Sequence, residues 1–400
     1  MTTASPAEPL VFPAARGGCP FSPPPAHQAA LIEEPVSQVS LWDGTKCWMI
    51  TKHADVRNVL RDDRFSAEAH RPGFPFITQG RRAVPKGQIS FIRMDDPEHS
   101  RLRRMLTAEF MIKRTEALRP RIQEIVDDFL DRMLANGSSA DLVAEYALPI
   151  PSLVICLLLG VDYADHEFFQ EHSRVVLRNA STAEEIDHAR EALVGYLTDL
   201  ARRKRTEPDD GIISGLVERG ELTDEQIAAM GLLLLIAGHE TTANMTALST
   251  LALLRDPEQL AKLRAEPALM KGAVEELLRF LSIVHTGVPR VAAEDVEIGG
   301  RLIRAGDGVL CMINSANRDA DTFPGPDELD ITRAESRRHL AFGFGVHQCL
   351  GQPLARVELQ IALETLLRRV PTLRLDCDPQ DIRYREDMAV YGVHELPVAW

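Results

Sequence analysis

The sequence predicts one large, mainly helical domain with small β-sheets. Apolar residues recur at helical spacing through most of the 400 residues, strand patterns are short, and no repeat, linker or charge block divides the chain. The composition, 45% hydrophobic and 26% charged, is typical of an ordinary soluble globular protein, which excludes disorder, collagen-like repeats and a disulfide scaffold. We therefore expect residues 1–400 to form a single domain.

Proline dominates the start of the chain. The prolines among the first 25 residues are Pro6, Pro9, Pro13, Pro20, Pro23, Pro24 and Pro25. Because proline lacks an amide donor and fixes φ, we expect an irregular arm over the surface to about residue 35. After this arm, residues 39–42 and 47–51 flank Asp43-Gly44, which predicts a β-hairpin.

Two strong helix patterns follow. Apolar residues repeat at three- and four-residue spacing over 122–134, which predicts an amphipathic helix. A second helix is expected to begin at Thr223, because Thr223 and Gln226 have capping-box spacing, and to run to Arg255. At about 1.5 Å per residue it would be about 50 Å long and cross the protein. Its middle, 232–237, is apolar on all sides, so this helix is expected to be central and buried.

Short strands are predicted again late in the chain. Residues 296–298 and 301–303 flank Gly299-Gly300, residues 309–313 follow, and the tail 391–400 has an extended pattern. Residues 69–90, in contrast, combine prolines and glycines with few periodic apolar positions. This stretch predicts a long loop of the kind that gates access to a pocket.

Charge and cysteine usage exclude several classes of protein. Lys and Arg total 45 against 59 Asp and Glu, a net charge of −14, which argues against a nucleic-acid partner. No two of the six cysteines form a CxxC pair, and scattered cysteines suggest a reducing compartment. No signal peptide is visible, and the most apolar run, 230–238, is far shorter than the roughly 20 residues of a membrane helix. We expect a cytoplasmic protein with no membrane anchor.

The most informative segment surrounds Cys349. Residues 342–351 read F-G-F-G-V-H-Q-C-L-G, and Gln352 to Arg356 open a helix. Three glycines in ten residues indicate a tight backbone that closely approaches another group. Cys349 is placed where amide donors and the positive end of a helix favour a thiolate. A thiolate can act as a nucleophile or as an iron ligand, and the residues alone leave both roles open.

The pattern F-G-x-G-x-H-x-C-x-G resembles the haem-binding signature of the cytochrome P-450 family, with every fixed position filled. The resemblance implies the fold of that family, with haem b held between the long central helix and the cysteine loop. It implies that Cys349 is the axial thiolate ligand of the iron, with Gly351 beside the cofactor. Thiolate donation favours cleavage of the O–O bond.

Residues 237–242, A-G-H-E-T-T, resemble the oxygen-activation motif of the same family. The Thr241 hydroxyl can bond the carbonyl of Ala237, four residues back, and bend the helix. By resemblance, the bend leaves room for O2 and water over the iron. Glu240 and Thr241 are then the catalytic residues, with Thr241 donating a hydrogen bond to the bound oxygen and Glu240 relaying protons.

Two further sets of residues are assigned by resemblance. Glu276 and Arg279 match E-x-x-R, and residues three apart share a helix face; with Arg333 they are expected to form a buried structural network that braces the haem loop. The haem propionates need donors. The residues expected to supply them are His99, Arg103, Arg290 and His347.

The substrate pocket is expected above the haem. Leu233 and Ala237 precede Thr241 by eight and four residues, so they share its helix face. The full set of pocket residues implied by the resemblance is Phe74, Phe76, Ile77, Leu233, Ala237, Val288 and Val390, with the stretch 283–288 as a whole.

The resemblance is greatest to the soluble actinobacterial branch of the family. It implies a monooxygenase that hydroxylates an apolar small molecule, such as a secondary metabolite, a sterol-like compound or a xenobiotic, with O2 and two electrons. The electrons come from an iron–sulfur ferredoxin and an NAD(P)H-dependent reductase. No GxGxxG after a strand indicates a flavin or nicotinamide domain in this chain.

An acidic ferredoxin is expected to dock on a local basic patch despite the net negative charge. The residues assigned to the patch are Arg101, Arg104, Arg337 and Arg338. Three other functions stay open: a haem peroxygenase or a ring- or bond-forming oxidase, a non-catalytic haem sensor or carrier, and a cysteine hydrolase. No base–orienter pair supports the hydrolase.

Overall fold

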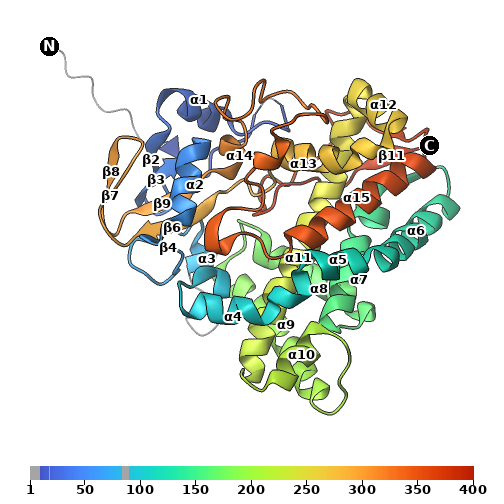
Figure 1. Ribbon diagram of the computed structural model, residues 1–400, viewed down its shortest axis with the longest axis horizontal. Helices are drawn as coiled ribbons and strands as arrows, with labels where there is room; N and C mark the ends of the chain where they lie inside the picture. The colour runs from blue at the N-terminus through green and yellow to red at the C-terminus, as the bar shows by residue number, and fades with distance from the viewer. Residues whose placement is uncertain (1–9, 18, 83–89) are drawn as a thin grey trace.

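The computed structural model describes residues 10–17, 19–82 and 90–400 and shows a mainly helical protein with small sheets (Figure 1). The predicted fold class is confirmed. The α-helices are α1 (Pro25–Glu33), α2 (His53–Arg61), α3 (Gln79–Arg82), α4 (Glu98–Thr107), α5 (Ile112–Ala117), α6 (Arg119–Ala135), α7 (Pro149–Leu159), α8 (His166–Leu177), α9 (Ala183–Lys204), α10 (Ile212–Arg219), α11 (Asp224–Leu254), α12 (Pro257–Ala265), α13 (Met270–Leu281), α14 (Ile313–Ala316) and α15 (Gln352–Arg369).

The largest sheet gathers strands from both halves of the chain. Its order is β1 (Leu10–Val11), β2 (Val36–Ser40), β3 (Lys46–Ile50), β9 (Gly308–Cys311), β6 (Val288–Ala292) and β4 (Phe65–Ser66). The predicted first hairpin is confirmed, because β2 and β3 pair antiparallel from Val36 with Ile50 to Ser40 with Lys46. Figure 1 shows this sheet to one side of the helical body, with α1 and α2 beside it.

The other two sheets are small. The predicted hairpin around Gly299-Gly300 forms as β7 (Val296–Ile298) and β8 (Arg301–Ile303). In the predicted extended tail, β11 (Pro397–Ala399) lies between β10 (Arg374–Leu375) and β5 (Ser139–Asp141). The tail is therefore tied to two distant parts of the chain.

The prediction of an irregular N-terminal arm holds for residues 12–17 and 19–24, which lie outside helices and strands, and is wrong at β1 and α1. Pro25 opens α1, because the first turn of a helix needs no amide donor from that residue and the fixed φ of proline already suits it. β1 pairs parallel with β2, and the amide of Phe12 donates to the carbonyl of Ser40 at 2.8 Å. Pro6 and Pro9 lie outside the described residues.

The predicted loop 69–90 contains a short helix. α3 occupies Gln79–Arg82, and Gly80 packs so closely against α9 that an added Cβ would lie 2.5 Å from a side-chain carbon of Ile186. Residues 83–89 of the predicted loop lie outside the described residues. The described part of the loop is therefore ordered against α9.

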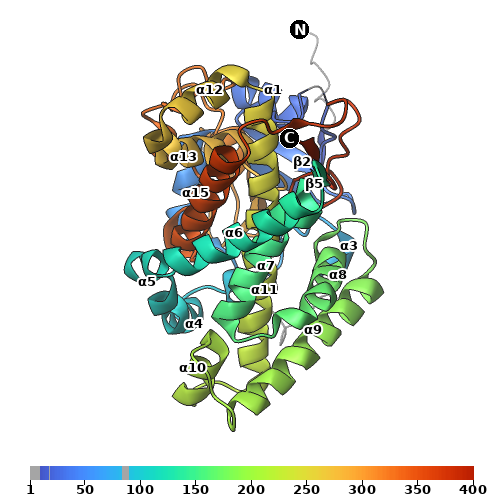
Figure 2. The ribbon, with the colours of Figure 1, turned by 90° about the vertical axis from the view of Figure 1, so that its right-hand side faces the viewer.

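The central helix was predicted well. α11 covers Asp224–Leu254, and Thr223 and Gln226 form the capping box, each side chain bonding the backbone amide of the other. Figure 2 shows α11 extending through the body of the protein, with α6, α7 and α15 on the side that faces the viewer. α11 packs against α7, α9 and α15 and is buried along most of its length.

Candidate functional site

The middle of this buried helix keeps accessible surface at residues 233, 236–238 and 241. Leu233, Ala237 and Thr241 have accessible surface, whereas residues 234, 235, 239 and 240 are buried. Spacing of four residues places Leu233, Ala237 and Thr241 on one helix face, the accessible stripe, as predicted. The Thr241 hydroxyl donates to the Ala237 carbonyl at 2.7 Å, and the helix continues through this bond without interruption.

The cysteine loop connects η7 (Ser336–Arg338) to α15, which begins at Gln352 as predicted. The amide of Cys349 donates to the carbonyl of Phe342 at 2.8 Å, which closes the loop on itself. Gly345 has a φ of +75°, and an added Cβ would lie 2.3 Å from the carbonyl oxygen of Leu60 at the end of α2. This glycine is therefore required by close backbone approach as well as by its backbone angle.

The side chain of Cys349 is exposed, in contrast to the buried cysteines Cys47, Cys156 and Cys311. The side chain has accessible surface, but the dense protein around it still desolvates the thiol, and this desolvation is the largest influence on its pKa, which it raises. The amides of Gly351 and Gln352 act in the opposite direction. The amides at the helix start therefore contact the thiol as expected and favour the thiolate, but the effect of desolvation on the pKa is larger. A bound cation would supply the missing stabilisation.

Four basic side chains converge beside this cysteine. The rings of His99 and His347 lie 3.9 Å apart, and Arg103 donates from Nη2 to the carbonyl of Gln348 at 2.6 Å. Nε2 of His99 and Nδ1 of His347 are buried without a hydrogen-bond partner in the described part of the protein. Burial and then the field of Arg290 lower the pKa of His347 to about 3.

The cradle formed by His99, Arg103, Arg290 and His347 suits anionic groups. Within the described ranges, neither Arg103 nor Arg290 forms an ion pair, although Arg290 is 3% exposed. Arg103 is half-buried, and the two guanidiniums donate to the backbone carbonyls of Gln348 and Pro289. Desolvated charges without a counterion are costly unless a ligand supplies acceptors. The two propionates of a haem would supply them, so the residues present fit that cofactor.

Glu276 and Arg279 form the predicted buried pair on α13. Arg279 donates from Nη2 and Nε to the two carboxylate oxygens at 2.7 Å each, and both side chains are fully buried. Arg333 joins them, with Nε 3.1 Å from Oε1 of Glu276. Arg279 also donates to the carbonyls of Asn317, Pro326 and Glu328, so the network fixes the irregular segment that leads to the cysteine loop.

The adjacent residue Glu275 anchors a second network that the sequence analysis missed. Arg356 of α15 donates to both of its carboxylate oxygens at 2.6 and 3.0 Å, and His339 Nε2 lies 3.2 Å away. Although burial opposes ionisation, these partners lower the pKa of Glu275 to about 2. The Arg356 guanidinium lies 4.6 Å over the ring of Phe342, so this network holds the first residue of the cysteine loop.

Glu240 has a partner that the sequence also did not reveal. Arg385 Nη1 lies 3.0 Å from Oε2 of Glu240, and Asn244 Nδ2 lies 3.4 Å from the same oxygen. Glu240 is 3% exposed, whereas Thr241, about 100° further around the helix, belongs to the accessible stripe. The structure therefore places the predicted proton donor in a buried ion pair beside the stripe.

The predicted pocket residues are distributed over several environments. Phe74 and Phe76 contact each other with ring centroids 5.0 Å apart. Ile77, in contrast, belongs to a hydrophobic cluster that includes Phe12 and Met312. Val390 belongs to the main hydrophobic core, and Val288 packs against the cluster around the large sheet.

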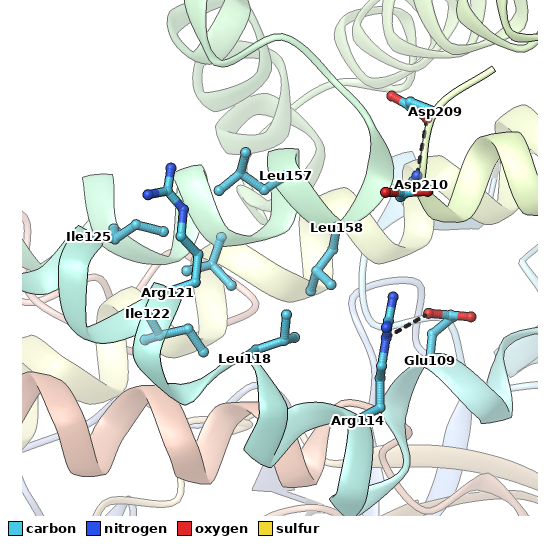
Figure 3. A pocket seen from close by; sticks show the side chains of 12 residues that line it. Glu109, Arg114, Leu118, Arg121, Ile122, Ile125, Leu157, Leu158, Asp209 and Asp210 are labelled. Atoms are coloured by element: carbon cyan, nitrogen blue, oxygen red, sulfur yellow. Dashed lines mark hydrogen bonds and ion pairs between the residues drawn. The ribbon is translucent and has the colours of Figure 1, made fainter.

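A separate pocket of about 240 Å³ lies between α5, α6 and α7 (Figure 3). It contains an ion pair between Arg114 and Glu109 and the apolar side chains of Leu118 and Leu158. None of the predicted site residues lines it. In the part of the chain that the structure describes, no helix is long and apolar enough to span a membrane.

The helical fold, the exposed cysteine in its glycine-rich loop and the anion cradle together define a haem-thiolate enzyme. The chain belongs to the cytochrome P450 family, whose profile matches residues 31–383. Its chemistry is that of a monooxygenase that uses haem b bound through a thiolate.

The relatives come from actinobacteria. The chain is 65% identical to cytochrome P450-SU2 of Streptomyces griseolus over 100% of both chains, and 50% identical to pentalenic acid synthase of Streptomyces avermitilis over 98% of both. The crystal structure of the mycinamicin VIII C21 methyl hydroxylase MycCI from Micromonospora griseorubida, bound to mycinamicin VIII, matches with a TM-score of 0.92. That protein is 40% identical to this chain, and the match covers 98% of this chain and 100% of the other.

The close approach at Gly345 gives a testable prediction. Gly345→Ala should lower haem retention and reduce the free energy of unfolding, because its Cβ would overlap a backbone oxygen that cannot move aside. Gly343→Ala is the matched control: its φ is +69°, but no atom lies within 4 Å of an added Cβ. Denaturant titration of both variants should show the larger loss for Gly345→Ala, and equal losses would contradict the account.

The Glu275 network predicts a specific dependence of stability on acid. Because its folded pKa lies below the unfolded value near 4.5, the ionised carboxylate stabilises the fold fully above that pH, and the contribution is lost as pH falls towards 2. Glu275→Gln should cost about 3 kcal/mol at neutral pH and flatten the fall in stability between pH 4.5 and 2. Urea titrations across this range test it, with exposed Glu266→Gln as control. If the free energy of unfolding of Glu275→Gln fell with pH as steeply as that of the parent, this role would be refuted.

Proposed function

We propose that Cys349 ligates the haem iron and that the protein hydroxylates an apolar small molecule with electrons from a ferredoxin. The observation that carries this proposal is the juxtaposition of the exposed Cys349 with a cationic cradle. Arg103 contacts the backbone of the residue next to Cys349, and the His99 and His347 rings contact each other. A thiolate and a set of propionate donors are thus available in one place.

The chain's own groups then have distinct roles. When bound, the haem supplies the iron centre at which O2 is reduced, one oxygen atom entering a C–H bond of the substrate and the other leaving as water. Arg103, Arg290, His99 and His347 would donate to the propionates, and Cys349 would supply the thiolate. The Glu275 and Glu276 networks keep the cysteine loop in position from both sides.

Protons would enter through Glu240 and Thr241. Thr241 carries a hydroxyl proton on the accessible stripe, directed to the Ala237 carbonyl. Glu240 is held by Arg385 and Asn244 on the neighbouring, buried side of α11. We assign Arg385 as a positioning residue, because it fixes the Glu240 carboxylate. That carboxylate is one residue away from the Thr241 hydroxyl, to which it would return a proton.

The substrate would approach the accessible stripe. Leu233 and Ala237 supply apolar surface there, and the Phe74–Phe76 pair supplies aromatic surface from the predicted loop. Apolar contacts with few polar groups are typical of small-molecule pockets. The names of two relatives, pentalenic acid synthase and mycinamicin VIII C21 methyl hydroxylase, support an organic small molecule as the substrate of this chain.

Substitution of the proposed ligand tests the function directly. Cys349→His should still bind haem, but its reduced carbon-monoxide complex should lose the red-shifted band typical of thiolate ligation, and hydroxylation should fall at least 100-fold. Cys19→Ser, which changes another exposed cysteine, should retain both properties. Retention of the band in Cys349→His would assign the ligand elsewhere.

The role of Thr241 predicts loss of coupling rather than loss of binding. Thr241→Ala removes the hydroxyl from the accessible stripe, so NADPH should still be consumed while more of its electrons leave as hydrogen peroxide. Product per NADPH should fall several-fold, with the substrate-induced spin shift retained. Thr242→Ala, which changes the buried neighbour, is the control and should remain coupled. Equal coupling in the two variants would remove Thr241 from the mechanism.

The expected basic patch is smaller than the sequence indicated. Arg101 is paired with Glu98 at 2.7 Å, so its charge is largely compensated, and Arg104 donates to the carbonyl of Ser100. Arg337 and Arg338 are exposed in η7, just before the cysteine loop. These two arginines are therefore the better candidates for contact with an acidic ferredoxin.

Charge reversal tests this docking surface. Arg338→Glu should raise the ferredoxin concentration needed for half-maximal turnover about ten-fold at low salt, and the effect should shrink at high salt because screening shortens electrostatic steering. Arg101→Gln should have a much smaller effect, because Glu98 already compensates its charge. Parent-like titration of Arg338→Glu at low salt would show that the ferredoxin docks elsewhere.

A further inference from the structure

Two half-buried arginines have no carboxylate partner in the part of the chain that the structure describes. Arg81, on α3, donates from Nη2 to the side-chain oxygen of Asn179 at 3.2 Å. The Arg93 guanidinium, in η2 (Phe91–Arg93), lies 5.4 Å from the ring centroid of Phe74. Neither forms an ion pair with any residue that the structure describes. The segment 83–89 contains no Asp or Glu, so the sequence beside Arg81 offers no counterion either.

Burial makes these charges expensive. Desolvation lowers the pKa of Arg81 to about 10 and that of Arg93 to about 9, and Arg290 and Arg81 lower the pKa of Arg93 further. Two buried arginines, in contrast, are paired: Arg279 with Glu276 at 2.7 Å and Arg318 with Asp327 at 3.0 Å. A guanidinium that is desolvated without a counterion is destabilising unless an anion binds and offsets its charge.

Charge balance leaves both arginines over, although Arg93 lies close enough to the cradle for its field to lower the pKa of His347. Its two propionates are matched in charge by Arg103 and Arg290, with His99 and His347 as additional donors. Arg81 and Arg93 then contribute two further positive charges. These arginines come from the segment between Phe74 and α4, which supplies the aromatic pair of the expected substrate pocket.

Arg81 lies where several other expected pocket segments meet. Its partner Asn179 donates from the backbone to the Asp387 carbonyl at 2.7 Å, next to the turn at 389–390. Nε2 of His285, in the stretch 283–288, lies 2.6 Å from the carbonyl of Met388. The field of Arg81 contributes to the lowered pKa of His285, after burial and the field of Arg16. The cation is therefore close to the expected pocket rather than in a remote part of the core.

We propose that Arg81 and Arg93 bind an oxyanion of the substrate, so that the enzyme selects apolar small molecules that carry a carboxylate. This inference rests on the proposed function and narrows its substrate class. Two guanidiniums beside an aromatic pair would bind the acidic end of such a molecule and leave its apolar part for the stripe on α11. Arginine suits this role because it stays charged when buried and can donate in a bidentate manner.

The test compares two probes that differ in one functional group. Dodecanoate and 1-dodecanol are titrated into the haem-loaded enzyme, and binding is followed by calorimetry, which also detects binding that leaves the spin state unchanged. The parent should bind dodecanoate at least ten-fold more tightly than dodecanol. Arg81→Gln and Arg93→Gln should each lose most of this preference by weakening dodecanoate alone, and Arg81→Lys should recover part of it.

Arg82→Gln is the matched control, because Arg82 is adjacent to Arg81 but its side chain is exposed and paired with Asp43. It should leave both affinities unchanged. Equal affinity of the parent for the two probes, or an equal loss in Arg82→Gln, would overturn the inference. So would undiminished dodecanoate binding in Arg81→Gln and Arg93→Gln. The carbon-monoxide spectrum separates this failure from a failure of the proposed function: a thiolate band without carboxylate preference overturns only the substrate class.

Discussion

Two neighbouring buried carboxylates, Glu275 and Glu276 on α13, fix the part of the structure on which the site depends. Glu276 binds Arg279 and Arg333, which hold the irregular segment before the cysteine loop, and Glu275 binds Arg356 and His339, which hold the loop's first ring. Removing one partner from such a buried pair costs about 3–5 kcal/mol, because the other charge is left without compensation. The position of the cysteine therefore depends on charges that have no part in the chemistry itself. Networks of this kind explain how a glycine-rich loop with two positive-φ glycines can have a single conformation.

The same electrostatic reasoning distinguishes structural from ligand-binding cations. Arginines that brace the fold, such as Arg279 and Arg356, each have a carboxylate partner at hydrogen-bond distance. In the described regions, four other arginines have no carboxylate partner: Arg103 and Arg290 in the cradle, and Arg81 and Arg93 near the expected pocket. A protein with a net charge of −14 has acidic residues to spare, yet in its described part these buried and half-buried cations have no carboxylate partner. Under the proposed function and substrate class, their counterions come from what the enzyme binds: a cofactor with two carboxylates and a substrate with one.

How much of this could be predicted from the sequence depends on how local the determining interactions are. Both ends of α11 were predicted, because a capping box lies at its start and Asp256-Pro257 directly follows its expected end at Arg255. The two hairpins were predicted from their turns. The first helix was missed because a cluster of prolines was interpreted as irregular, although Pro25 suits a helix start. Arg385 and Arg356 were missed for a different reason: they pair with Glu240 and Glu275 across 145 and 81 residues, and no periodic pattern reveals such contacts. The cysteine loop was recognisable because its chemistry needs several particular residues within ten positions.

The central claim is that these networks present the Cys349 sulfur to an iron that it ligates. Iron-edge X-ray absorption of the purified enzyme measures this contact most directly, because it counts the sulfur atoms bound to the metal. The account predicts one sulfur at about 2.3 Å, a usual metal–thiolate distance, in the parent and none in Cys349→His. It also predicts that in Glu275→Gln, whose cysteine loop is held less firmly, only a fraction of the molecules keep sulfur bound to the iron. A parent spectrum without sulfur, or a sulfur signal that persists in Cys349→His, would contradict the account.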